Sequence, residues 1–164
     1  MKWVTRERPK IDRIACPWLI RQFIDQDPEF LYVPSERVLA LAQETGAVPY
    51  DIPGVELSHV GERCSFDAFV TKYALQDPAL ECMAVIVRGA DTSRLDLAPQ
   101  CAGLYAISLG LSARFADDHE MLRHGMVVYD ALYAWCQRCQ GETHRWPPAG
   151  FRAAPDLTNV KQGA

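Results

Sequence analysis

The sequence predicts a single α+β domain over residues 1–140, with a small N-terminal mixed sheet and its helices followed by a C-terminal α-helical bundle. Three observations support this prediction. The length of 164 residues is that of one ordinary domain, short β-branched and aromatic runs fall within the first fifty or so residues, and apolar residues recur at intervals of three and four later in the chain. Residues 141–164 are rich in proline, glycine and alanine, so we expect a loosely ordered tail there.

The first fifty or so residues alternate between predicted strands and predicted helices. The runs "KWVT", "FLYVP" and "AVPYDI" have the composition of strands. Between the first two, apolar residues at helical spacing predict a helix from about Pro17 to Asp25, because proline is tolerated near the first turn. A second helix follows Ser35, its expected N-cap, and stops at Gly46. Together these elements predict a small βαβαβ layer.

The later part of the chain predicts helices. Ser65 is the expected N-cap of "FDAFVTKYAL", and Asp77 caps a helix with proline in its first turn that ends at Gly89. An apolar stripe over residues 104–132 then predicts either one long helix or two joined helices.

Composition narrows the classes of function. The formal net charge of −4 disfavours a general nucleic-acid surface. No apolar run approaches the roughly 20 residues that cross a bilayer, and the first ten residues lack the apolar segment of a secretory signal. Six cysteines without an export signal indicate a reducing compartment, so we expect a cytoplasmic protein with free thiols and no membrane contact.

The stretch "SHVGERCSFD", residues 58–67, contains several residues with metal-ligand chemistry. Gly61 suits a turn, Asp67 suits the first turn of a helix, and Glu62 is partly explained in the same way. These structural roles leave His59 and Cys64 unexplained.

A second polar cluster, "FADDHEMLRHGMVVYD", also contains residues that ordinary structural roles do not explain. In one continuous helix, Asp118 and His119 would fall on the apolar face, where ionisable groups need partners or a metal. If a new helix begins instead, Asp117 is its N-cap and Glu120 completes a capping box, which leaves Asp118 and His119 unexplained.

We therefore expect His59 and His119 to meet between the N-terminal layer and the bundle. Asp91 and one of Asp118, Glu62 or Asp67 would complete a site for a divalent transition metal such as Fe, Mn or Zn. In the structural alternative, each histidine bonds to its local backbone and the two rings lie far apart.

Five segments resemble the C-terminal domain of the chromate-resistance protein ChrB family, in order and over about residues 2–136. They are "TRERPKIDRIACPWLIRQFID", "VELSHVGERCSFDAF", "IVRGADT", "LAPQCAGLYAISLGLS" and "ADDHEMLRHGMVVYDALYAWC". The resemblance implies a cytoplasmic protein of a bacterial stress response to chromate. Longer members of the family are chromate-responsive regulators with an added N-terminal region thought to bind DNA. Because this chain starts at the C-terminal-domain motif and is acidic, we expect no DNA binding by this chain alone.

A relation to chromate adds two kinds of candidate residue. Chromate is a tetrahedral dianion, so guanidinium groups are its natural partners, and Arg13, Arg63 and Arg88 lie in the matched segments. Thiols reduce chromate, which makes Cys64 and Cys16 redox candidates, with a buried core role as the alternative. If Cys64 is functional, Arg63 and the start of the following helix should lower its pKa.

Three functional hypotheses follow. The first is a chromate-resistance domain that binds a metal ion or an oxyanion, for sensing or for detoxification. The second is a metal-dependent enzyme of unknown substrate, and the third is a chromate-responsive transcriptional regulator. Chromate or a related small oxyanion is the expected partner, and homodimer formation is left open.

Overall fold

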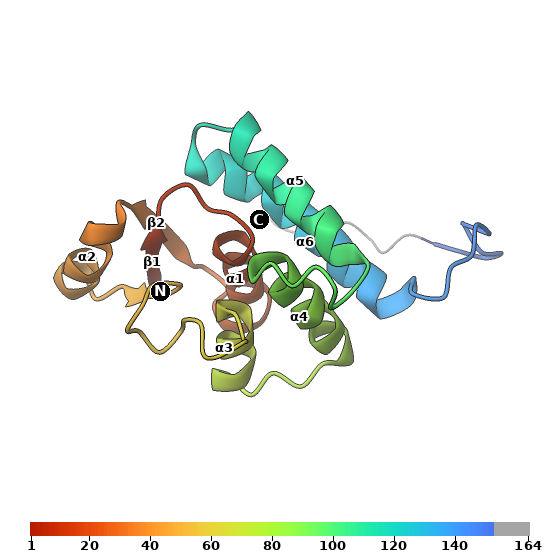
Figure 1. Cartoon of the computed structure of the whole chain (residues 1–164), viewed down its shortest axis with the longest axis horizontal. Coiled ribbons are helices and arrows are strands. Elements are labelled where there is room, and N and C mark those ends of the chain that lie inside the picture. The colour runs from red at the N-terminus through yellow and green to blue at the C-terminus, as the bar shows by residue number, and fades with distance from the viewer. Residues whose placement is uncertain (153–164) are drawn as a thin grey trace, which may run out of the picture.

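The computed structural model describes residues 1–152 and combines a three-stranded sheet with a set of helices (Figure 1). The elements are β1 (Lys2–Arg6), α1 (Asp12–Leu19), the π-helical turn η1 (Ile20–Ile24), β2 (Glu29–Val33), the 3-10 turn η2 (Ser35–Arg37), α2 (Val38–Thr45), β3 (Val48–Pro49), α3 (Ser65–Lys72), α4 (Pro78–Asp91), α5 (Gln100–Arg114) and α6 (Asp118–Arg138). The predicted α+β class is confirmed, with the sheet first and the helical bundle after it.

The sheet is parallel, in the order β2-β1-β3, and not mixed as predicted. Helix α1 connects β1 to β2, which pairs with one edge of β1. Helix α2 connects β2 to β3, which pairs with the other edge of β1. Side chains alternate along β1, so Trp3 belongs to the main core and Val4 to a smaller cluster with Val38 of α2. Both faces of the sheet are therefore covered, as is typical of parallel strands.

Helix α1 begins earlier than predicted, at Asp12, and holds Pro17 in its interior. Proline there removes the helical hydrogen bond to the carbonyl of Arg13, four residues earlier. The hydroxyl of Tyr32 on β2 donates to that carbonyl instead, at 3.0 Å. Because the freed carbonyl has this partner, the helix continues past the proline and runs into η1.

The bundle contains α4, α5 and α6, and α1 packs against α3, α4 and α6. Residues of α1 and Trp3 of β1 belong to the same hydrophobic core. The region predicted as one long helix or two consists of two, α5 and α6, which pack side by side (Figure 1). Asp117 caps α6 by accepting from the backbone N–H of Glu120 at 2.7 Å. Where α6 crosses α1 the helices touch closely, since a Cβ on Gly125 would lie 2.5 Å from Cγ2 of Ile14.

Helix ends follow most of the predicted capping residues. Asp77 caps α4, and Gly46 ends α2 in the left-handed conformation with φ of 70°. Three positions differ from expectation. Ser35 begins the 3-10 turn η2 and does not cap α2, whose N-cap is Arg37. Cys64, not Ser65, occupies the N-cap of α3, and Asp91 is the last residue of α4 instead of a loop residue.

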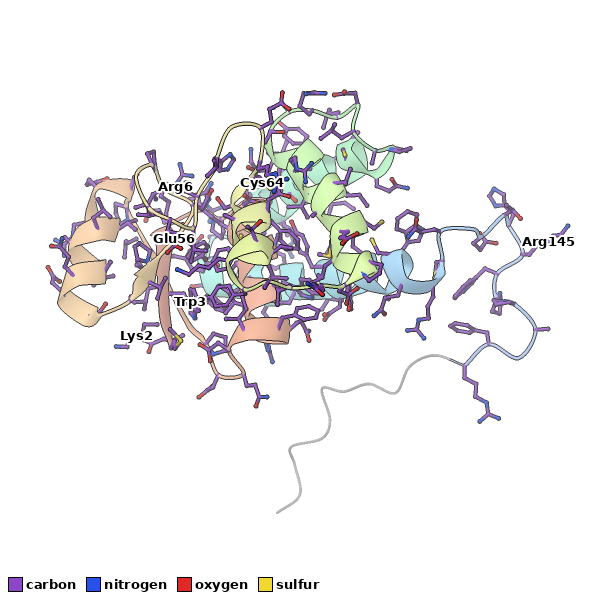
Figure 2. All side chains as sticks on the ribbon, turned by 90° about the horizontal axis from the view of Figure 1, so that it is seen from below. Lys2, Trp3, Arg6, Glu56, Cys64 and Arg145 are labelled. Carbon is purple, nitrogen blue, oxygen red and sulfur yellow. The ribbon has the colours of Figure 1, made fainter. Side chains whose placement is uncertain are left out.

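Residues 141–152 form no helix or strand and lead away from the bundle. In Figure 2, Arg145 and Lys2 consequently lie at opposite ends of the molecule. The rest of the predicted tail, residues 153–164, lies outside the described residues. Within residues 1–152, no helix has the length and apolar content needed to cross a bilayer.

Candidate metal centre

The candidate site lies at the carboxyl edge of the sheet, beyond the ends of β1 and β3. In the order β2-β1-β3 the chain leaves β1 to one side and later returns on the other, which makes the gap between β1 and β3 the switch point of the sheet. Ligand sites of parallel α/β sheets form outside the strand ends at such points. Asp12 follows β1 as the first residue of α1, and Asp51 lies two residues after β3.

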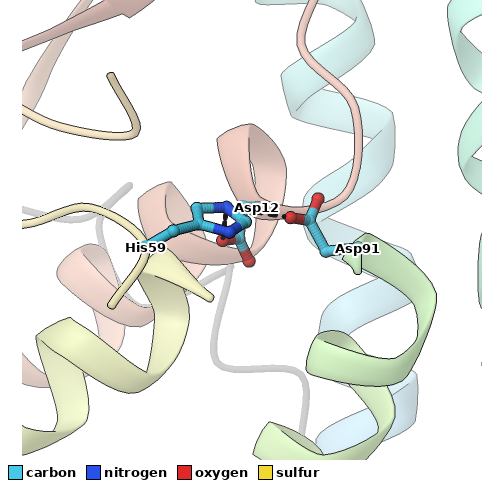
Figure 3. Close-up of side chains that lie close together, drawn as sticks. All are labelled: Asp12, His59 and Asp91. Carbon is cyan, nitrogen blue, oxygen red and sulfur yellow. Dashed lines mark ion pairs between the residues drawn. The ribbon is translucent and has the colours of Figure 1, made fainter. Parts of the chain in front are cut away.

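Three side chains from separate segments converge there (Figure 3): Asp12 at the start of α1, His59 from the loop before α3, and Asp91 at the end of α4. Nε2 of His59 lies 3.6 Å from Oδ2 of Asp12 and 3.1 Å from Oδ2 of Asp91. One ligand atom from each of the three residues lies within 4.8 Å of the others. Atoms bound to one ion at about 2.0–2.2 Å are at most about 4.4 Å apart, so a small contraction would surround an ion.

Asp12 has a buried oxygen without a partner. Its side chain is 1% exposed, and its Oδ2 accepts from the backbone N–H of Ser65 at 2.6 Å. Its Oδ1 has no hydrogen-bond donor within the part of the chain that the structure describes. Leaving a buried polar atom without a partner is costly, so this oxygen needs a cation or a proton.

The backbone is strained where it presents these carboxylates. Ile11, directly before Asp12, has φ of 47° and ψ of −97°, although β-branched residues avoid positive φ. Ile11 is fully buried, and its carbonyl accepts from the hydroxyl of Tyr129 at 3.1 Å. Asp51 also has a positive φ, of 53°. Each such residue costs about 1–3 kcal/mol and persists only where surrounding contacts hold it, often at a functional site.

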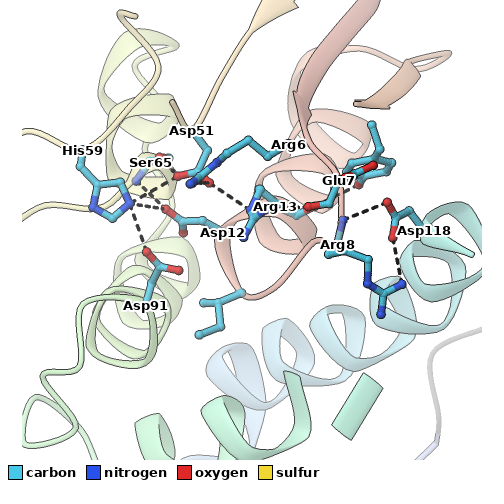
Figure 4. Close-up of polar contacts among 12 residues, drawn as sticks. Arg6, Glu7, Arg8, Asp12, Arg13, Asp51, His59, Ser65, Asp91 and Asp118 are labelled. Carbon is cyan, nitrogen blue, oxygen red and sulfur yellow. Dashed lines mark hydrogen bonds and ion pairs between the residues drawn. The ribbon is translucent and has the colours of Figure 1, made fainter. Parts of the chain in front are cut away.

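Asp51 belongs to the same cluster, but arginines balance its charge (Figure 4). Its Oδ2 lies 2.9 Å from Nη2 of Arg6 and 3.3 Å from Nε of Arg13. Its Oδ1 accepts from Oγ of Ser65 at 2.8 Å and lies 3.4 Å from Nε2 of His59. Ser65 therefore links two carboxylates, because its hydroxyl donates to Asp51 and its backbone N–H donates to Asp12.

The pKa shifts distinguish Asp51, whose charge arginines balance, from Asp12 and Asp91, which have no arginine partner within residues 1–152. Burial, followed by repulsion from neighbouring carboxylates, raises the pKa of Asp12 and that of Asp91. Burial acts the same way on Asp51, but hydrogen bonds from His59, the serine and an arginine outweigh it and lower the pKa. Contact with Asp51 and attraction to the other carboxylates raise the pKa of His59 to about 9. Without a metal, the protonated imidazole thus supplies the positive charge at this point.

Of the six predicted metal ligands, the structure brings together His59 and Asp91. Glu62 is 92% exposed and lies 3.8 Å from Arg94. Asp67 accepts from the N–H of Cys64 at 3.0 Å and is paired with an arginine of α4, so its oxygens are already occupied.

His119 and Asp118 lie elsewhere, in the first turn of α6. Asp118 accepts from the backbone N–H of Arg8 at 2.9 Å, and the ring of His119 meets that of Tyr32 on β2 with centroids 5.5 Å apart. Figure 4 shows Asp118 and His59 on opposite sides of the β1–α1 loop. The expected pairing of His59 with His119 is therefore wrong, because the break between α5 and α6 starts a new helix whose first turn faces β2.

Two of the predicted oxyanion ligands line a surface pocket next to the metal centre. This arginine pocket, of about 770 Å³, is lined by Arg63, Arg88 and Arg94, by one acid, Glu62, and by Val60, Gly61, Thr92 and Leu97. Arg88 also binds Asp67 of α3 through two hydrogen bonds of 2.9 and 2.6 Å. The third predicted ligand, Arg13, lies at the carboxylate of Asp51 instead.

Cys16 and Cys64 are both fully buried. Burial is the largest cause that raises the pKa of each thiol, and the charge of Asp12 adds to it. The lowered pKa expected for Cys64 is therefore wrong. The charges that act on this thiol are those of buried carboxylates, and exposed Arg63 does not offset them.

The sequence interpretation missed Asp12, Asp51 and Arg6. The available signal was their position, since each occurs at or after the end of a predicted strand of the βαβαβ layer. Asp12 is also an acid between two isoleucines, Ile11 and Ile14, which both prove to be buried.

The fold and the site together define a small α+β domain with an Asp-His-Asp cluster at the switch point of a parallel sheet. The chain belongs to the ChrB family, because residues 3–136 match the family model described as ChrB, C-terminal domain. It is 30% identical to Protein ChrB of Cupriavidus metallidurans over 133 residues, which are 80% of this chain and 40% of that protein. The chain thus spans less than half the length of that relative, and no solved structure matches it. Membership of the family associates the chain with chromate resistance.

Proposed function

We propose that this chain is a chromate-resistance domain that binds one divalent first-row transition-metal ion through Asp12, His59 and Asp91. The observation that carries the proposal is Oδ1 of Asp12, a buried oxygen with no donor among the described residues. An imidazole and a second carboxylate lie within reach of the same ion. The six free cysteines support a cytoplasmic location for the domain.

The ligand set suits such an ion in charge and in chemistry. Two carboxylates and one imidazole match Mn²⁺, Fe²⁺ or Zn²⁺, and three protein ligands leave a position for water or a small ligand. The charges of the two unbalanced carboxylates equal that of a divalent ion once His59 loses its proton. Asp51 stays outside this count because Arg6 and Arg13 hold its charge, and it orients its neighbours as partners of metal ligands do.

The arginine pocket favours a second ligand, a tetrahedral oxyanion such as chromate. Arg88 and Arg94 of this pocket are paired with Asp67 and Asp96, whereas Arg63 has no ion pair within residues 1–152, so its guanidinium is available to an anion. Charge-assisted bonds from guanidinium groups are the usual means of holding such oxyanions. We assign the oxyanion to this pocket and not to the metal centre, because the carboxylates around His59 repel anions.

Metal titration of the purified chain tests the proposal. The protein is stripped with a chelator and titrated with Mn²⁺, Zn²⁺ and, without oxygen, Fe²⁺, while bound metal is counted by elemental analysis. We expect one ion per chain, and loss of binding in His59→Ala.

His119→Ala is the matched control, because its ring lies on β2 away from the centre. It should bind as the wild type does. A wild-type chain that binds none of the three ions, or equal binding by the two histidine variants, would refute the metal centre.

A further inference from the structure

We propose that the metal centre and the arginine pocket are linked, so that a cation in the first and an oxyanion in the second strengthen each other's binding. This inference rests on the proposed function, since both sites must take their ligands. It goes further by making each ligand a regulator of the other. Three structural connections between the sites support it.

The first connection is the hairpin that follows His59. Val60 and Arg63 exchange two backbone hydrogen bonds of 3.1 Å each, and Gly61 closes the turn with φ of 60°. Positive φ suits glycine, so the turn is tight without strain. His59 is a proposed metal ligand, and Arg63 at the other end of the hairpin lines the arginine pocket. A shift of the imidazole towards an ion therefore moves a wall of the pocket.

The second connection is the last turn of α4. Asp91 points to the metal centre, while Arg88, three residues earlier, and Thr92, the next residue, line the arginine pocket. The backbone N–H and the hydroxyl of Thr92 both donate to the carbonyl of Arg88, at 2.9 and 2.7 Å. One closed helical turn thus carries a ligand of the cation and two residues facing the anion.

The third connection runs through the start of α3. Arg88 holds the carboxylate of Asp67 by two hydrogen bonds, and Asp67 in turn accepts from the N–H of Cys64 at 3.0 Å. The next residue, Ser65, donates its N–H to Asp12 at 2.6 Å. This path is buried where it reaches Asp12, so a change at either end is not absorbed by solvent-exposed side chains.

The charges determine the sign of the coupling. Without an ion, the two carboxylates of Asp12 and Asp91 outnumber the single imidazole of His59 between them, so a net negative charge remains and disfavours an anion nearby. A divalent cation cancels that field, and partial burial reduces the screening by salt. Couplings between two sites are typically fivefold to 150-fold and are necessarily equal in both directions. We expect about tenfold in this range.

Calorimetric titrations with two simple probes test the coupling. The Kd of Mn²⁺ is measured in sodium sulfate and in sodium chloride of equal ionic strength, and the Kd of sulfate is measured with and without Mn²⁺. We expect about tenfold tighter Mn²⁺ binding in sulfate, and the same factor for sulfate in Mn²⁺. Arg63→Gln should bring the factor close to one. Arg37→Gln, an exposed control on η2, should preserve it.

Each failure has its own meaning. Equal Kd values of Mn²⁺ in sulfate and chloride would overturn the coupling and leave the metal centre intact. The coupling is equally overturned if sulfate does not bind to the Mn²⁺-loaded chain. If Mn²⁺ binds in neither salt, the proposed metal centre fails and the coupling fails with it.

Discussion

Replacing Asp12 with asparagine separates the binding role of this carboxylate from its structural role. Asparagine keeps an oxygen that accepts the 2.6 Å bond from Ser65, but it removes a charge that burial and neighbouring carboxylates oppose. Because folding raises this pKa above the ordinary 3.8, stability is greatest below that pH and falls as the pH rises through the raised pKa. At pH 7 the metal-free Asp12→Asn variant should therefore be at least as stable as the wild type.

The effect of an ion on stability then differs between the two proteins. An ion at 100 times its Kd stabilises the wild type by about 2.7 kcal/mol. For a chain of this size that raises the Tm by about 5–11 °C. Loss of even an outer partner of a metal ligand weakens affinity about 10–100-fold, so loss of a charged ligand should raise the Kd at least about a hundredfold. The same ion concentration then adds only about 0.4 kcal/mol to the Asp12→Asn variant, or about 1–2 °C.

Thermal melts followed by circular dichroism, with EDTA and with Mn²⁺, measure both quantities. Glu36→Gln removes one exposed carboxylate on η2 and controls for the change in net charge. It should show the full shift with Mn²⁺. An equal Tm shift with Mn²⁺ for wild type and Asp12→Asn would refute the ligand role of Asp12. A Tm of Asp12→Asn in EDTA several degrees below that of the wild type would refute the electrostatic reasoning.

Three other measurements address the centre, the thiols and the helix packing. Contact with carboxylates raises the pKa of His59 to about 9, so the stability that its charge contributes is complete below about pH 6.5 and is lost as the pH rises through 9. An ion must displace the proton of this imidazole. Mn²⁺ affinity should therefore rise over that pH interval, with about one proton released per ion near pH 7. Calorimetry in buffers of different ionisation enthalpy checks this, and an affinity independent of pH would contradict it. Burial raises the pKa of Cys64, so iodoacetamide should label it more slowly than half-buried Cys139, as mass spectrometry of the folded protein would show; faster labelling of Cys64 would count against the buried thiol. Gly125→Ala should lower the free energy of unfolding by about 1–3 kcal/mol, because its Cβ would lie 2.5 Å from a side chain of α1. Gly103→Ala, with open space around it, should instead stabilise the chain by up to about 1 kcal/mol in urea denaturation, and equal effects of the two substitutions would refute the packing argument.

Most of the fold was predictable because its signals are local. The composition of short segments predicted the strands of the βαβαβ layer, and apolar spacing predicted the helices. Asp77, Asp117 and Gly46 begin or end helices where capping chemistry places them. The start of α1 was missed because Pro17 normally opens a helix. Pro17 is tolerated inside α1 because the hydroxyl of Tyr32, on β2, donates to the carbonyl that the proline leaves without a helical hydrogen bond. The all-parallel pairing of the strands was also missed, because the sequence of a single strand does not determine the direction of its neighbours.

The candidate site was predictable only in part. His59 stood out in the sequence because no turn or cap explains it. Asp12 and Asp51 did not stand out, because Asp12 lies before the predicted helix start at Pro17 and Asp51 lies within the predicted strand "AVPYDI". Their meeting depends on the order β2-β1-β3, which is a long-range property. His119 looked equivalent to His59 in the sequence, yet it packs against Tyr32, so an unexplained histidine is a weaker signal than a buried acid without a donor.

The charges around His59 decide which kind of ligand the centre can hold. Two unit charges 4 Å apart interact by about 4 kcal/mol at the effective dielectric constant of about 20 that suits protein sites. A dianion next to both Asp12 and Asp91 would meet four such repulsions and only two attractions, to the protonated imidazole of His59, whereas a divalent cation that displaces this proton gains four attractions. Arg6 and Arg13 do not reverse this balance, because the carboxylate of Asp51 lies against both of them. If the chain binds an oxyanion, we therefore expect it away from the sheet edge, in the arginine pocket lined by Arg63 and Arg88.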